Sequence, residues 1–213
     1  MTLGWDNPTT QATITVLLRH GDTCLSPEHR FSGLRDLPLS DSGTRQAQAA
    51  ASRLAAGTRI DAVVSSPLRR AAATAAIAAG ELGLTAVTDD DLRETDFGDW
   101  EGFTLAEIQQ RWPAAVAAWQ HNPEQAPPGG ESFADTAHRV HRACDRLLRD
   151  HSGQTVLVVS HITPIKILLC RALGVPLGTL YRLYLGSACI NEIQWHGREF
   201  AAVRRVNDTS HLL

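Results

Sequence analysis

Three apolar runs of this sequence end in residues that could do chemistry on an anion. The run Thr13–Leu18 is followed at once by Arg19, His20 and Gly21. Arginine offers a planar fork of donors that matches phosphate oxygens, and imidazole can donate a proton or act as a nucleophile. Glycine lets the backbone come close to a ligand. These residue types after a buried strand indicate an anion site with a nucleophile.

The same pattern occurs at two other places. The run 155–159 ends in Ser160 and His161, and the run 61–64 leads through two serines to Arg69 and Arg70. Short β-branched runs of this kind are typical of buried strands. Ligands bind beyond the carboxyl ends of parallel strands. We therefore expect Arg19, His20, Arg70 and His161 to meet at one point.

The elements that must position these residues alternate between strand and helix. The expected strands cover residues 13–18, 61–64, 85–87, 155–159, 182–185, 190–195 and 199–206. The expected helices cover residues 44–56, 68–82, 104–111, 113–120, 132–151 and 164–173. Such alternation predicts a three-layer α/β/α sandwich, with a mainly parallel central sheet and helices on both faces.

The chain length of 213 residues is within the range of a single domain. We expect a linker or N-terminal tail over 1–12, one domain over 13–206 and a C-terminal tail over 207–213. A helical insert over 103–131 is expected to cover the site. We expect three tryptophans either to pack the insert against the domain or to line the substrate entrance: Trp100, Trp112 and Trp119.

Composition favours a soluble protein of the cytoplasm. Hydrophobic residues make up 43% and charged residues 20%, with a net charge of -3 that gives no electrostatic case for nucleic acid or an anionic membrane. The four cysteines lack metal-type spacing and are expected to be reduced thiols. His138 and His141 lie three apart on an expected helix without a third ligand nearby, so we interpret them as surface residues. No metal or other cofactor is expected.

Five blocks of the sequence, in order, resemble the histidine phosphatase superfamily, which contains phosphoglycerate mutases and many phosphatases. They are Arg19–Gly21, Ser65–Thr74, Leu92–Gly102, Pro128–Ser132 and Ser160–His161. The resemblance runs from about residue 13 to 206. It implies a phosphoglycerate mutase-like fold.

The resemblance also implies the roles of individual residues. His20 would be the nucleophile that becomes phosphorylated, with Arg19 and Arg70 holding the phosphate oxygens and His161 completing the pocket. The functional arginine of this family directly precedes an alanine, which selects Arg70 over its neighbour. The proton donor of the family lies in the leucine-x-glutamate block, which selects Glu94.

Departures from the family pattern occur at three positions. Asp22 stands where glutamate is commoner, Ser26 where many relatives have asparagine, and Ile162 where glycine is usual. A phosphate contact by Ser26 remains open, and Ile162 would offer only its backbone N–H. Glu131 is either a first-turn helix charge or part of the substrate pocket.

Phosphoryl transfer sets opposite protonation demands on the two central groups. His20 must be neutral to attack, and flanking Arg19 and Arg70 should lower its pKa from about 6.5. Glu94 must carry a proton for the leaving oxygen. These demands predict a bell-shaped pH profile with an acidic to near-neutral optimum. The two arginines and His161 would supply the positive charge without a metal.

The sequence around Glu94 resembles the phosphatase branch, including α-ribazole phosphatases, more than the mutases. Arg111 is the single Arg or Lys of the insert 103–131. Binding the carboxylate of a phosphoglycerate would require more cations, so this composition favours a phosphatase over a mutase. We therefore expect an acid phosphatase acting on small phosphate monoesters. The alternatives are a mutase-type phosphotransferase and a non-catalytic domain that binds phosphorylated ligands.

A narrower resemblance concerns residues 5–10, 160–166 and 180–183. They look like the C-terminal acid phosphatase domain of bifunctional ribonuclease H/acid phosphatase proteins of mycobacteria and other actinobacteria. This implies fusion to an upstream ribonuclease H domain in the full-length protein, with a free-standing homologue as the alternative. No ribonuclease-type carboxylate set occurs in the chain, so we expect no nucleic acid to be bound by this domain.

Overall fold

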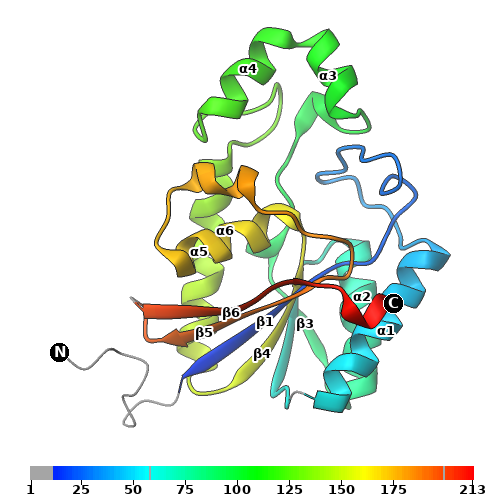
Figure 1. Ribbon diagram of the computed structural model, residues 1–213, viewed down its shortest axis with the longest axis vertical. Coiled ribbons are helices and arrows are strands. Elements are labelled where there is room, and N and C mark those ends of the chain that lie inside the picture. The colour runs from blue at the N-terminus through cyan, green and yellow to red at the C-terminus, as the bar shows by residue number, and fades with distance from the viewer. Residues whose placement is uncertain (1–11, 58, 199) are drawn as a thin grey trace.

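The structure is a computed structural model that describes residues 12–57, 59–198 and 200–213 (Figure 1). In these ranges the sheet has six strands in the order β3-β2-β4-β1-β5-β6. Their bounds are β1 Thr13–Arg19, β2 Ala62–Ser65, β3 Ala86–Thr88, β4 Thr155–Ser160, β5 Ile190–His196 and β6 Phe200–Asp208. Strands β1 to β4 pair in parallel, and β5 and β6 are antiparallel. The expected mainly parallel sheet is confirmed.

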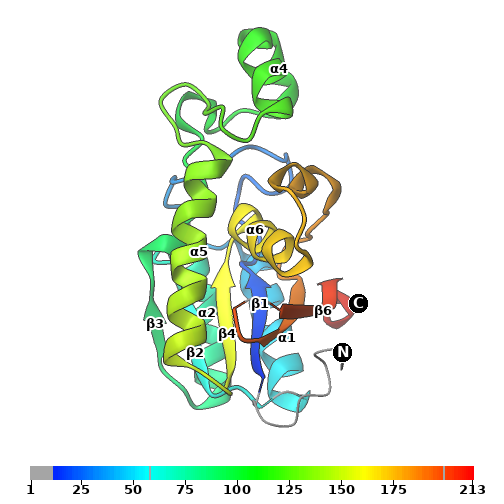
Figure 2. The same cartoon turned by 90° about the vertical axis from the view of Figure 1, so that its left-hand side faces the viewer.

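Helices cover both faces of this sheet (Figures 1 and 2). Helices α1 (Asp41–Gly57) and α2 (Arg69–Leu82) pack on one face, and α5 (Phe133–Asp150) and α6 (Ile162–Leu173) on the other. Within β1, Val16 and Leu18 join the α1/α2 core while Leu17 joins the α5/α6 core. Successive side chains of a strand point to opposite faces, so a continuous apolar run fills both cores.

The expected insert forms a pair of short helices, α3 (Leu105–Arg111) and α4 (Pro113–His121), set apart from the sheet in Figure 1. Thr104 begins α3 with a capping box, and Pro113 occupies the first turn of α4, where its missing N–H costs nothing. Trp100 and Trp119 are buried edge-to-face with ring centroids 5.3 Å apart, and Trp112 packs on Phe103. The tryptophans thus pack the insert, and Trp119 also lines a cavity, so the two expected alternatives are both met at that residue.

Four 3₁₀ helices complete the described elements: η2 Asp90–Leu92, η3 Gly98–Trp100, η4 Leu177–Arg182 and η5 Ser210–Leu212. The expected strand over 182–185 is wrong, because Arg182 ends η4 and Leu185 pairs with no strand. The segment approaches the sheet at β1, where the Leu185 carbonyl accepts from Arg19, and both edges of β1 are already occupied by β4 and β5.

The ends of the domain also differ from expectation. Strand β6 continues through Asp208, and η5 then contacts α1, so the segment 207–213 is part of the fold. Helix α6 begins at Ile162, two residues before the expected Pro164, which fits within the first turn. The expected linker 1–12 lies outside the described residues except for Ala12.

The four cysteines are free thiols, with Cys24 exposed and the other three buried. In the ranges described, no helix has the length and apolar character needed to cross a membrane.

Candidate active site

The register of the sheet brings the two histidines together. Arg19, the last residue of β1, lies opposite Ser160, the last residue of β4, and the His20 N–H donates to the Ser160 carbonyl at 3.1 Å. The rings of His20 and His161 consequently lie with centroids 5.0 Å apart. The structure thus places Arg19, His20, Arg70 and His161 at the carboxyl end of the sheet.

Gly21 has a packing role that differs from the expected one of approach to a ligand. A Cβ atom there would lie 2.2 Å from the Gly43 carbonyl oxygen, in the first turn of α1. Its N–H donates to the Thr74 hydroxyl of α2 at 3.3 Å. The turn after β1 is therefore held by both α1 and α2, which fixes the position of His20.

One nitrogen of the His20 ring carries no proton. Nδ1 lies 2.7 Å from the Gly21 carbonyl oxygen, which can only accept, so Nδ1 carries the proton of the neutral ring. Nε2 then keeps its lone pair, and Arg70 Nε donates to it at 3.2 Å. Burial, and next the charges of Arg19 and Arg70, hold the pKa of His20 well below its usual value. These contacts favour a neutral His20 with its lone pair on Nε2.

Both arginines are anchored by backbone carbonyls. Arg70 donates to the carbonyls of Arg35 and Gly33 at 2.7 and 2.8 Å, and Arg19 donates to that of Leu185 at 2.7 Å. Arg19 Nε is buried without a partner among the described residues. Carbonyl dipoles orient a guanidinium without cancelling its charge, and arginine stays protonated in proteins. The site therefore keeps positive charge beside His20.

His161 contributes hydrogen bonding and no charge. Burial and the nearby Arg70 and His20 hold the pKa of His161 well below its usual value. This environment favours a neutral His161, in contrast to the positive charge expected from the sequence. His161 Nε2 lies 2.8 Å from the Ser66 hydroxyl, which also accepts from the Leu68 N–H. When that hydroxyl donates to Nε2, the buried Nδ1, which has no partner in the described chain, becomes a free donor toward an anion.

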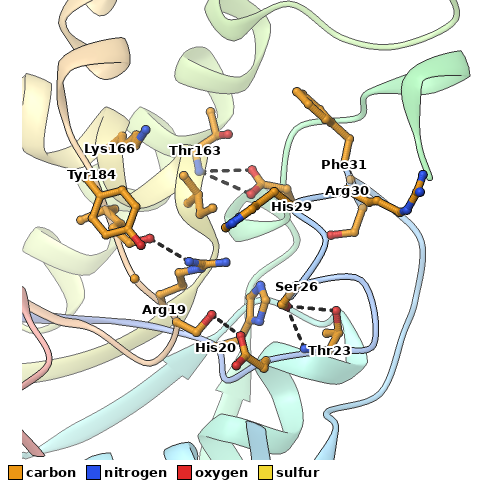
Figure 3. A pocket seen from close by; sticks show the side chains of 18 of the residues that line it. Arg19, His20, Thr23, Ser26, His29, Arg30, Phe31, Thr163, Lys166 and Tyr184 are labelled. Carbon is orange, nitrogen blue, oxygen red and sulfur yellow. Dashed lines mark hydrogen bonds between the residues drawn. The ribbon is translucent and has the colours of Figure 1, made fainter. Parts of the chain in front are cut away.

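Glu94 lies on the wall of the same cavity, in the loop after η2. Its carboxylate accepts from the Thr95 N–H at 2.8 Å and from the Thr163 N–H at 3.3 and 3.4 Å (Figure 3). Ser160 donates to the Leu92 carbonyl at 2.7 Å, which ties this loop to the end of β4. A proton donor or acceptor is thus held near the histidines by backbone groups.

The cavity has a volume of about 780 Å³ and contains Arg19, His20, Ser26, Glu94 and Ile162 in its lining. Ser26 accepts from the Thr23 N–H at 2.9 Å, so it also closes the turn after His20 (Figure 3). Six aromatic side chains line the cavity as well: Phe31, Phe97, Trp119, Phe133, Tyr181 and Tyr184. The cavity joins an anion site to an aromatic wall.

Glu131 lies outside this cavity, in a neighbouring hollow of about 250 Å³. Its carboxylate forms an ion pair with Arg139 and accepts from the Asp96 N–H at 3.0 Å. These contacts favour the structural interpretation of Glu131. Arg111, the single cation of the insert, packs over the Phe103 ring at 4.1 Å and does not line the cavity.

Sequence reasoning missed three residues at or near the site. Ser66 was quoted only as part of a block, Arg139 resembles the other basic residues of a helix face, and Lys166 sits in an apolar helix. A signal for Lys166 existed, because it is the single lysine of the chain. Among the described residues, no three His, Cys, Asp or Glu side chains gather as a metal site would require.

Comparison with known proteins agrees with this geometry. The model of the histidine phosphatase superfamily, branch 1, matches residues 15–209. The chain is 48% identical over 209 residues to bifunctional protein Rv2228c of Mycobacterium tuberculosis, covering 98% of this chain and 57% of that protein. The chain therefore spans little more than half of that relative's length.

Two further relatives match over almost their whole length. Phosphoserine phosphatase 1 of Hydrogenobacter thermophilus is 32% identical over 198 residues, covering 92% of this chain and 93% of that protein. The solved structure of mycobacterial glucosyl-3-phosphoglycerate phosphatase Rv2419c superposes with a TM-score of 0.83 at 33% identity, covering 92% and 99% of the two chains. The chain belongs to the histidine phosphatase superfamily, branch 1.

Proposed function

We propose that this domain is a metal-independent acid phosphatase that hydrolyses small phosphate monoesters through a phosphohistidine on His20. The observation that carries the proposal is the unprotonated Nε2 of a neutral His20, which accepts from the buried Arg70 and lies beside the half-buried Arg19. Phosphatase relatives over nearly the full length support hydrolysis. The low pKa of His20 keeps the nucleophile neutral in mildly acidic solution, which supports an acidic optimum.

In the first step, His20 Nε2 attacks phosphorus and the bond from phosphorus to the ester oxygen breaks. Arg19, Arg70 and the free N–H of His161 hold the equatorial oxygens, whose charge must be balanced in the transition state. In the free protein Arg70 Nε donates a hydrogen bond to His20 Nε2. When the substrate binds, Arg70 Nε donates to a phosphate oxygen in place of Nε2. Protonated Glu94 gives its proton to the leaving oxygen, so an alcohol departs.

In the second step, water attacks the phosphorus of phosphohistidine and the bond to Nε2 breaks. The Glu94 carboxylate takes the proton of this water, which restores its acid form. Inorganic phosphate leaves, and His20 returns to the neutral tautomer that the Gly21 carbonyl fixes. Ile162 would offer its N–H at the start of α6, where a helix terminus favours an anion.

The aromatic wall supports esters whose leaving group carries a ring, α-ribazole phosphate among them. A structural neighbour from Escherichia coli, with a TM-score of 0.82, is a putative alpha-ribazole-5'-P phosphatase. Fusion to a ribonuclease H domain stays a proposal, and its support is the greater length of the mycobacterial relatives.

The test compares hydrolysis of p-nitrophenyl phosphate and glycerol 3-phosphate by four proteins. His20→Ala should lower kcat/KM for both esters by about 10³-fold or more, since the nucleophile is gone. Glu94→Gln should lower kcat/KM by about 10²-fold or more for glycerol 3-phosphate. It should lower kcat/KM much less for p-nitrophenyl phosphate, because the nitrophenolate leaving group needs no proton. His138→Ala, at an exposed position of α5, is the matched control and should behave as wild type.

Equal rates for His20→Ala and wild type would refute the nucleophile. Transfer of the phosphoryl group to an added acceptor alcohol, without release of inorganic phosphate, would identify a mutase-type enzyme instead. Absence of turnover by wild type on every ester would point to a binding domain.

A further inference from the structure

The single lysine of this chain lies on the wall of the active-site cavity. The chain has 20 lysine and arginine residues, and all of them except Lys166 are arginines. Lys166 lines the cavity from helix α6. Ile162, Thr163 and Lys166 face the cavity together, since residues three and four apart share one face of a helix. The neighbouring residues Ile165 and Ile167 are buried in the core. An ammonium therefore lines the cavity from a mostly apolar helix, whose other charged residue, Arg171, pairs with Asp145 in the last turn.

Lys166 differs from the other cations around the cavity in having no acceptor. Within the described chain it makes no hydrogen bond and no ion pair, whereas the arginines of the cavity wall are all held. Arg19 is bonded to Leu185, and Arg30 to Glu28 and Glu107. Burial lowers the pKa of Lys166, against the opposing charge of Glu94. A partly desolvated ammonium without a contacting acceptor gains stability when an anion binds to it.

The transferred phosphoryl group already has its own partners. Arg19, Arg70 and His161 surround the reactive nitrogen of His20. Figure 3 shows Lys166 well separated from His20, with the Arg19 side chain between them. Lys166 therefore faces the part of the cavity where the leaving group must lie.

The charge and surroundings of Lys166 define the group that it would bind. One ammonium balances one negative charge, which matches a carboxylate better than a second phosphate dianion. The remaining wall on this side is aromatic, with Phe97 and Tyr184 in the lining. We propose that Lys166 binds a carboxylate of the leaving group, and that phosphate monoesters of hydroxy acids are therefore preferred over ring-bearing esters without a carboxylate, such as α-ribazole phosphate. This proposal rests on the proposed function.

A matched pair of esters tests this role. In 3-phosphoglycerate and glycerol 3-phosphate the phosphoryl group and carbon skeleton are the same, and a carboxylate replaces a hydroxymethyl group. The measured quantity is the ratio of their kcat/KM values for phosphate release. Lys166→Met, which keeps the length of the stem, should lower this ratio about 10-fold, and Lys166→Arg should retain most of it.

Equal losses on both esters would overturn the proposal, because Lys166 would then act on the phosphoryl group or on Glu94. An unchanged ratio in Lys166→Met would overturn it too. Failure of the proposed function is recognised separately, by the absence of p-nitrophenyl phosphate hydrolysis in the wild-type protein.

A second measurement does not depend on turnover. Lysine labelled with ¹⁵N and ¹³C gives one side-chain signal in this chain, because Lys166 is its single lysine. In the His20→Ala background, 3-phosphoglycerate should shift this signal, and glycerol 3-phosphate should shift it much less. A signal that responds equally to both esters, or to neither, would contradict carboxylate binding.

Discussion

At the scale of single residues, the site depends on two histidines kept neutral inside the protein. His20 and His161 are both buried, and burial together with neighbouring arginines holds the pKa of each well below its usual value. The same environment makes protonation of His20 costly and keeps the ring neutral, as the proposed nucleophile role requires. Reactivity and acid sensitivity thus have one cause.

This cause predicts how stability depends on pH. Below about pH 6.5 the unfolded chain takes up protons at both histidines while the folded protein does not, so the free energy of unfolding falls as the pH drops. Each histidine contributes a slope of up to about 1.4 kcal/mol per pH unit until its lowered pKa is reached. His161→Gln should reduce this slope in denaturant titrations between pH 6.5 and 5.

The exposed His138 provides the control for this measurement. His138→Gln should leave the slope unchanged. If His161→Gln showed the wild-type slope, His161 would not be neutral in the folded protein.

At the scale of elements, helix α5 positions the loop that carries Glu94. Arg139 donates to the carbonyls of Asp91, Arg93 and Glu94 at 2.9, 2.6 and 2.9 Å, and Glu131 balances its charge. One guanidinium therefore fixes three points of the loop backbone. Glu131, which sequence patterns could not assign, acts through this clamp.

We predict that Arg139→Met displaces the loop that carries Glu94. The variant should then show part of the loss of activity expected for Glu94→Gln, because Glu94 can no longer protonate the leaving oxygen efficiently. The variant should lose about 10-fold or more in kcat/KM on glycerol 3-phosphate and clearly less on p-nitrophenyl phosphate. Arg142→Met is the matched control on the same helix, since Arg142 is 61% exposed and pairs with Asp91 at the surface. If Arg139→Met lowered kcat/KM equally for both esters, the contacts of Arg139 would serve stability alone.

At the scale of the whole molecule, the sequence predicted what strong local patterns determine. Apolar runs ending in Arg19, Ser160 and Ser65 identified the parallel strands, and their register then brought the histidines together. The segment 182–185 was wrongly expected to be a strand, because pairing depends on which sheet edges are free. That information is absent from a local pattern.

Residues that act through distant contacts were the ones that sequence patterns missed. Arg139 contacts carbonyls more than 40 residues away, and nothing in its helical periodicity marks it. Lys166 falls in the block 160–166, but only the folded structure shows that its side chain lines the cavity. The sequence therefore predicts the residues around the proposed phosphoryl site, and the structure adds the other residues that line the cavity.

The central claim is that His20 carries the phosphoryl group, and trapping this intermediate tests it most directly. In Glu94→Gln, p-nitrophenyl phosphate can still phosphorylate His20, but the water of the second step loses its base. Rapid quenching in alkali, which preserves phosphohistidine, followed by peptide mass spectrometry should find one phosphoryl group on His20. A phosphoryl group on another residue, or sustained nitrophenolate release with no adduct at His20, would contradict the account.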